Sequence, residues 1–379
     1  MKYLHEHPDW PNFIFDEVRL ARMISPIRFR QGHLIGQMSR LGFEISDTLD
    51  METISRDIVS SSNIEGVIVS LDAVRSSVSH RLGLERGGID PVNRDIEGLV
   101  DLMLDATRNF GPLTKDRICG WQAALFPTGY SGMYKIRTGD YRKSEDGAMQ
   151  IVSGPVGREK VHYVAPDADR LDYEMTRFLG WINGEKNLDP VIKAGIAHLW
   201  FVSLHPFEDG NGRVARALAD HVLAKSEGVP MRFYSISTEI NANRKEYYRI
   251  LEKTQTKELD ITEWLEWMTE TVDRSVRTAS VLVDKVIQKV ADINVAKDAG
   301  CNDRQLALIH RLHEGFKGDL TSEKYSKIAK CSAEEAQEEL KHLSDLGILC
   351  QELKGNSGKT VFSLGHDFSE EDDDRYPKA

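Results

Sequence analysis

The most constraining segment of this sequence is the run VIKAGIAHLWFVSL at positions 191–204. Apolar side chains cover nearly every face of the helix that this spacing predicts, and such a helix is stable only when other elements surround it. Pro206 disfavours helical geometry at His205, so the helix is predicted to end at Leu204. We therefore expect a core in which one buried helix is packed among others.

Most other apolar patterns also follow helical spacing. Helices are predicted at 96–104, at 113–125 with Thr114 as the N-cap, and at 171–182, followed near the C-terminus by 306–312, 323–330 and 333–347. Two segments are typical of β-hairpins, MQIVSGPVGREKVHYV (149–164) and ILCQELKGNSGKTVFSL (348–364). The fold class is therefore mainly α, and three helices followed by a hairpin are typical of a winged-helix module.

Composition and charge argue against several classes of protein. The net charge of −11 disfavours nonspecific adhesion to nucleic acid or to a membrane surface. Charged residues interrupt every apolar run well before the roughly 18 residues that span a bilayer. The N-terminus MKYLHEHPDW lacks the pattern of a signal peptide, and the cysteines show no CxxC spacing. We expect a protein of the reducing cytoplasm, without membrane partners.

The segment after the buried helix, HPFEDGNGRVAR (205–216), carries the groups of an anion site. Gly210 and Gly212 permit close backbone approach at the start of the next helix. The free N–H groups and the dipole of that helix terminus attract anions. Arg213 and Arg216 lie three positions apart and can both bind phosphate oxygens. This arrangement predicts a phosphate-containing ligand.

Two further residues of the segment add chemistry to the anion site. Asp209 would repel a bare phosphate unless a divalent cation lay between them, and Mg²⁺ often binds through one carboxylate plus phosphates. His205, neutral near pH 7, is available to accept a proton from a hydroxyl group. Together these groups favour phosphoryl or nucleotidyl transfer assisted by magnesium.

Two simpler interpretations do not account for all residues of this segment. A calcium loop starting at Asp209 fails because Arg213 and Val214 stand where an oxygen ligand and a glycine are required. A capped helix turn would explain Asp209 and the glycines, but not His205, Asn211 and the arginines together.

The segment HPFEDGNGRVAR resembles, without a gap, the Fic-family signature HxFx(D/E)GNGRxxR. GDYRK at 139–143, the hairpin that follows it and the helix pair around the motif are also similar to that family. The resemblance covers residues 90–270 most strongly. It implies a Fic-type helical core with a β-hairpin flap, and transfer of AMP from ATP to a side-chain hydroxyl of a protein.

The resemblance also implies a role for each motif residue. His205 would deprotonate the target Ser, Thr or Tyr, and Asp209 would hold Mg²⁺ between the α- and β-phosphates. The anion cradle would be formed by Gly210, Asn211 and Gly212, with Arg213 and Arg216 holding the distal phosphates. Arginine rather than lysine at position 213 favours AMP transfer over phosphorylation.

Residues outside the motif receive roles by the same resemblance. The hairpin at 149–164 would be a flap that pins the target by β-strand addition, with Ile151 and Val152 as contacts. Tyr248 would help to enclose the adenine, although simple packing explains this tyrosine equally well.

Residues 61–66, SSNIEG, fit the inhibitory-helix signature (S/T)xxxE(G/N) of Fic proteins. On its own the segment would be a helix end with an exposed carboxylate. The resemblance implies that Glu65 pairs with Arg216 and that Ser61 holds the helix end. A carboxylate and the γ-phosphate would then compete for one guanidinium, and misplaced phosphates would prevent in-line attack. Relief by a changed oligomer and relief by modification of this helix both stay open.

We divide the chain into an N-terminal helical region with the inhibitory helix (1–90), the Fic core (91–285), a winged-helix-like domain (286–366) and an acidic, disordered tail (367–379).

GNSGKT (355–360) lacks the first glycine of a phosphate-binding P-loop and is interpreted as the wing turn. The acidic helix start AEEAQEEL disfavours DNA, so protein recognition or dimerisation is preferred.

The leading hypothesis is an autoinhibited protein adenylyltransferase with ATP and a hydroxyl-bearing protein as partners. A nucleotide-sensing transcriptional regulator is the alternative from another class. Transfer of a different phosphate-containing group, and a homodimer, also stay open.

Overall fold

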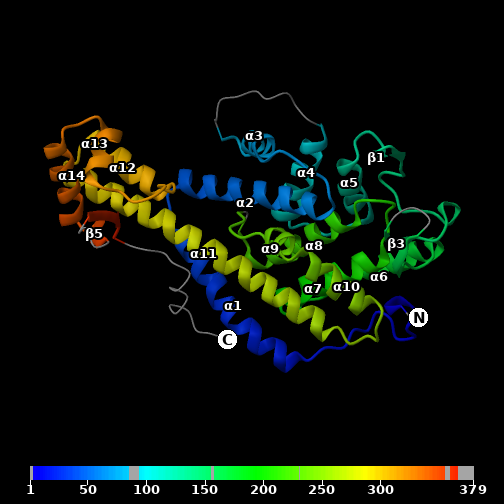
Figure 1. The fold of residues 1–379 in the computed structure, drawn as a ribbon. Helices are drawn as coiled ribbons and strands as arrows, with labels where there is room; N and C mark the ends of the chain where they lie inside the picture. The colour runs from blue at the N-terminus through cyan, green and yellow to red at the C-terminus, as the bar shows by residue number, and fades with distance from the viewer. Residues whose placement is uncertain (1–2, 85–93, 155–157, 230, 355–358, 366–379) are drawn as a thin grey trace. The chain divides into compact units, whose positions relative to one another are not determined.

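The computed structural model describes residues 3–84, 94–154, 158–229, 231–354 and 359–365 (Figure 1). The chain forms two compact units, residues 1–278 and 279–378, which are described separately. Residues 355–358 of the expected wing turn and the expected acidic tail at 367–379 lie outside the described residues.

The first unit is mainly helical, which confirms the predicted fold class. Its helical elements are η1 (Leu4–Glu6), α1 (Glu17–Met38), α2 (Phe43–Ile64), α3 (Leu71–Arg81), α4 (Arg94–Arg108), α5 (Lys115–Leu125), η2 (Ser144–Asp146), η3 (Ala168–Arg170), α6 (Leu171–Gly184), α7 (Pro190–Leu204), α8 (Asn211–Glu227), α9 (Ile236–Ala242), α10 (Arg244–Gln255) and the first part of α11 (Thr262–Asp298). Two hairpins complete it, β1 (Tyr130–Ser131) with β2 (Tyr134–Lys135), and β3 (Gln150–Ser153) with β4 (Lys160–Val164).

The apolar helix predicted at 191–204 is α7, and it is buried along almost its whole length. Asp189 caps its start by accepting from the N–H of Val191 at 2.8 Å, and Pro190 occupies the first turn. Helices α6 and α8 pack against α7. A Cβ at Gly195 would lie 2.8 Å from Leu265, so glycine lets α11 approach α7 closely. The core of the unit is therefore built around this helix.

Helix α2, which carries the inhibitory signature, is held in the same unit by hydrogen bonds to two of its buried carboxylates. Asp50 accepts from the N–H of Arg232 at 2.7 Å. About two turns further on, Asp57 accepts from the hydroxyl of Ser237 at 3.1 Å. Ile54 and Ile58 are fully buried on the same helix. The body of α2 is thus part of the core rather than a surface addition.

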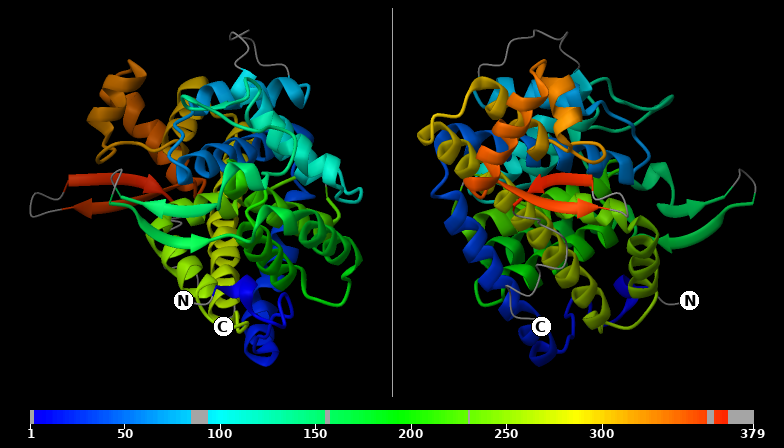
Figure 2. Two further views of the ribbon diagram at one scale, coloured as in Figure 1. Left: turned by 90° about the vertical axis from the view of Figure 1, so that its right-hand side faces the viewer. Right: turned by 60° about the vertical axis from the view of Figure 1, so that its left-hand side comes forward.

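The β3–β4 hairpin projects beyond the helices of the first unit (Figure 2). It is the hairpin predicted at 149–164, and its strands pair Ile151 with Tyr163 and Val152 with Val161. Tyr163 is buried and its hydroxyl donates to the carbonyl of Ser203 at 2.9 Å. One end of the hairpin is therefore tied to the last turn of α7.

The second unit contains the remainder of α11, then α12 (Asp303–His313), α13 (Ser322–Ala329), α14 (Ala333–Asp345), β5 (Leu349–Lys354) and β6 (Lys359–Leu364). These helices and this hairpin follow in the predicted order. Ile309, Leu340 and Leu343 form part of its separate hydrophobic core. Glu339, also buried, accepts from the hydroxyl of Tyr325 at 2.6 Å.

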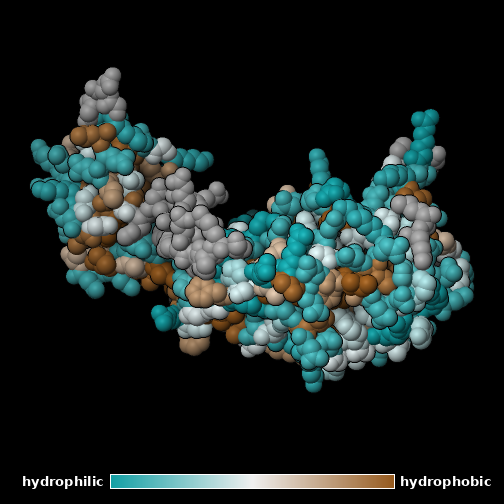
Figure 3. All heavy atoms as spheres, turned by 90° about the horizontal axis from the view of Figure 1, so that it is seen from below, coloured by the Kyte–Doolittle hydropathy of each residue, from teal (hydrophilic) through white to brown (hydrophobic). Residues whose placement is uncertain are grey.

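The face shown in Figure 3 is largely hydrophilic, with hydrophobic groups in separated patches. The most exposed large hydrophobic side chains include Phe43, Ile68 and Met133. Within the described residues, no helix combines the length and the hydrophobicity that crossing a membrane requires.

Candidate active site

The loop that follows α7 has an unusual backbone at its first residue. His205 takes the left-handed conformation, with φ 47° and ψ 58°, immediately before Pro206. Arg142 holds this loop, because its main-chain N–H donates to the carbonyl of Pro206 at 2.9 Å. Its buried guanidinium donates to the carbonyl of His205 at 2.8 Å. Arg142, noted in sequence only as part of GDYRK, is therefore a clamp for the motif.

The side chain of Asn211 closes the same loop. Its Oδ1 accepts from the N–H of Phe207 at 2.9 Å, and its Nδ2 donates to the carbonyl of Phe207 at 2.7 Å. Phe207 is fully buried between Phe201 and Tyr141, so its ring anchors the loop in the core. Since the Asn211 amide is used within the loop, only its main chain is left for the expected anion cradle.

Helix α8 begins directly after Gly210, whose φ is 90°. No side chain caps its first turn, so the N-terminus keeps its attraction for anions. Gly212 lies in that turn, where an added Cβ would stand 2.1 Å from Oε1 of Glu65 and 3.3 Å from Nη1 of Arg216. Only glycine permits this approach, and the anion at this terminus is the carboxylate of Glu65.

Arg216 connects α8 to the end of α2. Its fully buried guanidinium donates through Nη2 to Oε1 of Glu65 at 2.8 Å and to the carbonyl of Ser61 at 2.8 Å. Its Nε donates to the hydroxyl of Ser61 at 2.9 Å. The guanidinium expected to hold a phosphate is thus bound to the last turns of α2.

Tyr248 of α10 lies at the same helix end. Its hydroxyl donates to the carbonyl of Ile64, the last residue of α2, at 2.9 Å. The ring lies 5.0 Å from that of Tyr247, between centroids, and 41% of the residue is exposed. The side chain that the resemblance assigned to adenine is therefore partly exposed and contacts the end of α2 through its hydroxyl.

His205 is held in the form of a base. Burial lowers its pKa to about 4, so the imidazole is neutral at pH 7. Its Nδ1 lies 3.2 Å from the carbonyl oxygen of Val202. Because a carbonyl can only accept, Nδ1 carries the proton and Nε2 keeps a free lone pair.

Asp209 and Arg213 lie on the other side of the loop. Oδ2 of Asp209 accepts from the hydroxyl of Ser131, and Oδ1 accepts from the N–H of Gly210. A guanidinium nitrogen of Arg213 lies 3.9 Å from Oδ1, and this guanidinium stacks over the ring of Phe126. The described part of the chain contains no cluster of three or more carboxylate, histidine or cysteine side chains suited to a metal.

A cavity of about 580 Å³ separates the flap from the motif. Val152 and Val161 of the hairpin line it together with Arg142 and Glu208 of the loop region. Val152 is exposed, whereas Ile151 is partly buried and does not line the cavity. Of the two expected flap contacts, Val152 is therefore the one that faces this space.

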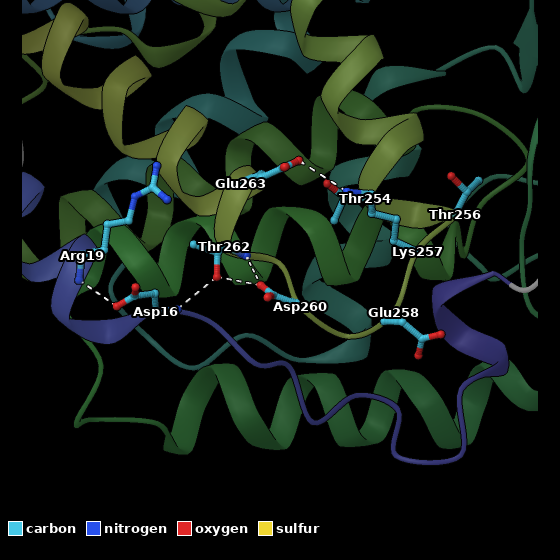
Figure 4. Close-up of a pocket in the computed structure, with 9 residues that line it drawn as sticks. All are labelled: Asp16, Arg19, Thr254, Thr256, Lys257, Glu258, Asp260, Thr262 and Glu263. Carbon is cyan, nitrogen blue, oxygen red and sulfur yellow. Dashed lines mark hydrogen bonds and ion pairs between the residues drawn. The ribbon is translucent and has the colours of Figure 1, made fainter.

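Another cavity, of about 570 Å³, contains no residue of the motif (Figure 4). It lies where the start of α1 meets the loop between α10 and α11. Its polar groups bind one another: Asp260 accepts from the N–H of Thr262 at 2.9 Å, and the hydroxyl of Thr262 accepts from the N–H of Asp16 at 3.0 Å. These bonds join the start of α1 to the start of α11.

Comparison with known proteins divides the first unit into two matched regions. Residues 3–84 match a family described only as a domain of unknown function, DUF4172. Residues 112–223 match the Fic/DOC family.

Curated relatives match parts of the chain. It is 27% identical over 233 residues to protein adenylyltransferase Fic of Culex quinquefasciatus, covering 60% of this chain and 41% of that protein. It is 36% identical over 121 residues to protein adenylyltransferase fic-1 of Caenorhabditis elegans, covering 31% of this chain and 22% of that protein. The chain thus spans less than half the length of these relatives.

A solved structure is similar over nearly the whole chain. The crystal structure of a Fic family protein from Desulfovibrio desulfuricans G20 covers 95% of this chain and 99% of its own, with a TM-score of 0.53 and 22% identity. At this identity the likeness concerns the fold alone.

Proposed function

Because residues 112–223 carry a Fic domain, we propose that this protein is an adenylyltransferase that transfers AMP from ATP to a Ser, Thr or Tyr hydroxyl of a target protein. The observation that carries the proposal is a neutral histidine beside an uncapped helix N-terminus. The names of the curated relatives, protein adenylyltransferases, support the same activity.

The proposed base is Nε2 of His205. The Nδ1 proton is engaged by Val202, so Nε2 is free to take the proton of the target hydroxyl. The hydroxyl oxygen forms a bond to the α-phosphorus of ATP, and the bond from that phosphorus to the pyrophosphate oxygen breaks. Arg142 keeps the imidazole in place through the His205 carbonyl and does not itself meet the reacting atoms.

The proposed phosphate site is the first turn of α8. Its N–H groups at Asn211 and Gly212 bind an anion without a competing side-chain cap, while the N–H of Gly210 donates to Asp209. Arg213 is the distal-phosphate ligand that is not engaged by α2. Arg216 becomes a second ligand only after Glu65 leaves.

The residues present fit a magnesium ion carried in with ATP. Asp209 offers one half-exposed carboxylate, which matches the preference of Mg²⁺ for one protein oxygen plus phosphate oxygens. When bound, the ion would neutralise charge on the phosphates. The chain's own part is to hold that carboxylate beside the first turn of α8.

We propose that the enzyme is autoinhibited by the end of α2. Glu65 occupies the space against Gly212 and takes a donor of Arg216. Arg216 of α8 and Tyr248 of α10 hold the same helix end, through Ser61 and through the carbonyl of Ile64. ATP would have to displace this carboxylate before its phosphates could align for in-line attack.

The target is proposed to add a strand to the β3–β4 flap. Ile151 and Val152 lie on β3, which among the described residues pairs with β4 alone. The cavity that Val152 lines also borders Glu208 of the motif, and is proposed to receive a side chain of the target.

For the remaining chain, we keep the proposed division into 1–90, 91–285 and a winged-helix-like domain at 286–366. Exposed Glu334 and Glu338 on α14 disfavour DNA, so this domain is proposed to bind protein or a second copy. The free cysteines support a reducing compartment.

The test is incorporation of label from ATP carrying ³²P in the α-phosphate, with γ-labelled ATP as a second channel and lysate as a source of targets. Glu65→Gly should gain strong α-label, and adding His205→Ala should remove it. Label arriving only from the γ-position would mean phosphoryl transfer. No label from any variant would favour the nucleotide-sensing alternative.

A further inference from the structure

The short β1–β2 hairpin lies against the loop between α7 and α8, although no pattern in the sequence assigned this hairpin a function. Its strands pair Ser131 with Tyr134 and Tyr130 with Lys135. Gly129 and Gly132 both have positive φ, of 76° and 56°, which shapes the sharp turn at each end of β1. The base of the hairpin is closed by the N–H of Ile136, which donates to the carbonyl of Gly129 at 3.0 Å.

The contact with the loop is made by one hydroxyl. Ser131 donates to Oδ2 of Asp209, while the N–H of Gly210 donates to Oδ1. Two donors from different elements thus fix the plane of the carboxylate. Since 43% of the Asp209 side chain is exposed, other lone pairs still face solvent.

A half-exposed aspartate without the Ser131 contact would rotate about its side-chain bonds and lose entropy on binding an ion. Donors in the outer shell of a metal site commonly remove that cost, because they orient the ligand in advance. The donor here comes from a hairpin distant in sequence from the motif, which explains why the motif alone did not reveal it.

We propose that Ser131 is a positioning residue that holds the carboxylate of Asp209 ready for the magnesium ion of Mg·ATP. The inference rests on the proposed function of the site, and concerns only how Asp209 is prepared. It makes the β1–β2 hairpin a structural part of the nucleotide site.

The test measures binding rather than transfer. The full chain carrying Glu65→Gly is titrated calorimetrically with α,β-methylene-ATP, once in Mg²⁺ and once in EDTA. The dissociation constant in EDTA divided by that in Mg²⁺ is the gain in affinity due to the metal. Ser131→Ala should lower this ratio about 10-fold, with affinity in EDTA unchanged. Ser131→Thr, which keeps the hydroxyl, should restore most of the gain.

Met133→Ala is the matched control, because Met133 lies at the exposed tip of the same hairpin, 91% accessible. It should leave the ratio unchanged. An unchanged ratio in Ser131→Ala would overturn the inference, and so would an equal loss of affinity with and without metal. A parent chain without any gain from Mg²⁺ would overturn it too. Failure of AMP transfer itself would not affect these titrations, so the two proposals fail separately.

Discussion

The carboxylate of Glu65 occupies the space over Gly212 that we propose for a phosphate of ATP, so Glu65→Ala should raise both the affinity for ATP and the rate of the proposed AMP transfer. The change removes the anion from the first turn of α8 and frees a donor of Arg216. Nothing else in the last turn of α2 needs to move for this effect.

The size of the expected gain follows from one contact, the hydrogen bond between Arg216 and Glu65. A hydrogen bond between charged groups contributes about 1.5–3 kcal/mol net. Because roughly 1.4 kcal/mol corresponds to a tenfold change, its loss predicts a gain of about 10- to 150-fold. Glu65 is 31% exposed while Arg216 is fully buried, so partial screening by water places the expected value in the lower half of that range.

Two assays should agree on this gain. Calorimetry gives the affinity for ATP, and α-labelled ATP gives the initial rate of labelling. Glu65→Gln keeps an acceptor without charge and should lie between the wild type and Glu65→Ala. Asn63→Ala changes the same turn of α2 without touching Arg216, and should behave as the wild type.

The reasoning would be refuted if Glu65→Ala bound ATP no more tightly than the wild type. It would be equally refuted if Asn63→Ala activated to the same extent, because the effect would then come from general loosening of α2 and not from the carboxylate.

Other substitutions test neighbouring contacts. Tyr248→Phe removes one hydrogen bond to the end of α2 and should activate only about 2- to 10-fold, measured as the labelling rate. In a Glu65→Gly chain, labelling should fall with acid around pH 4, because His205 works only when unprotonated and burial lowers its pKa to about 4; a midpoint near 6.5 would contradict this. Arg232→Met should cost about 3–5 kcal/mol in urea unfolding, since it strands the buried carboxylate of Asp220, 2.7 Å away. Arg249→Met, in an exposed ion pair, should cost under about 1 kcal/mol.

The local part of the site could be predicted from the sequence. Pro206 predicted where α7 ends, and α7 does end at Leu204. The glycines predicted a helix start, and α8 begins at Asn211. These features follow from the conformational limits of neighbouring residues, which a single segment carries in full.

Contacts between distant segments could not be predicted in this way. Arg142 bonds to the carbonyl of His205, and Ser131 bonds to Asp209. Both residues come from segments distant in sequence, and no spacing pattern connects these segments with the motif. Asn211 was assigned to the cradle because of its position in the motif. Its amide is turned to Phe207, a choice that depends on how the loop closes around a buried ring.

Because Asp50 and Asp57 anchor the body of α2 in the core, detaching the whole helix would unfold the unit that we propose it restrains. Glu65, exposed just beyond the end of α2, can be exchanged without disturbing that core. Under the proposed autoinhibition, exchanges at this one position would set the resting activity. The level of background modification would then be inherited separately from the ability to fold.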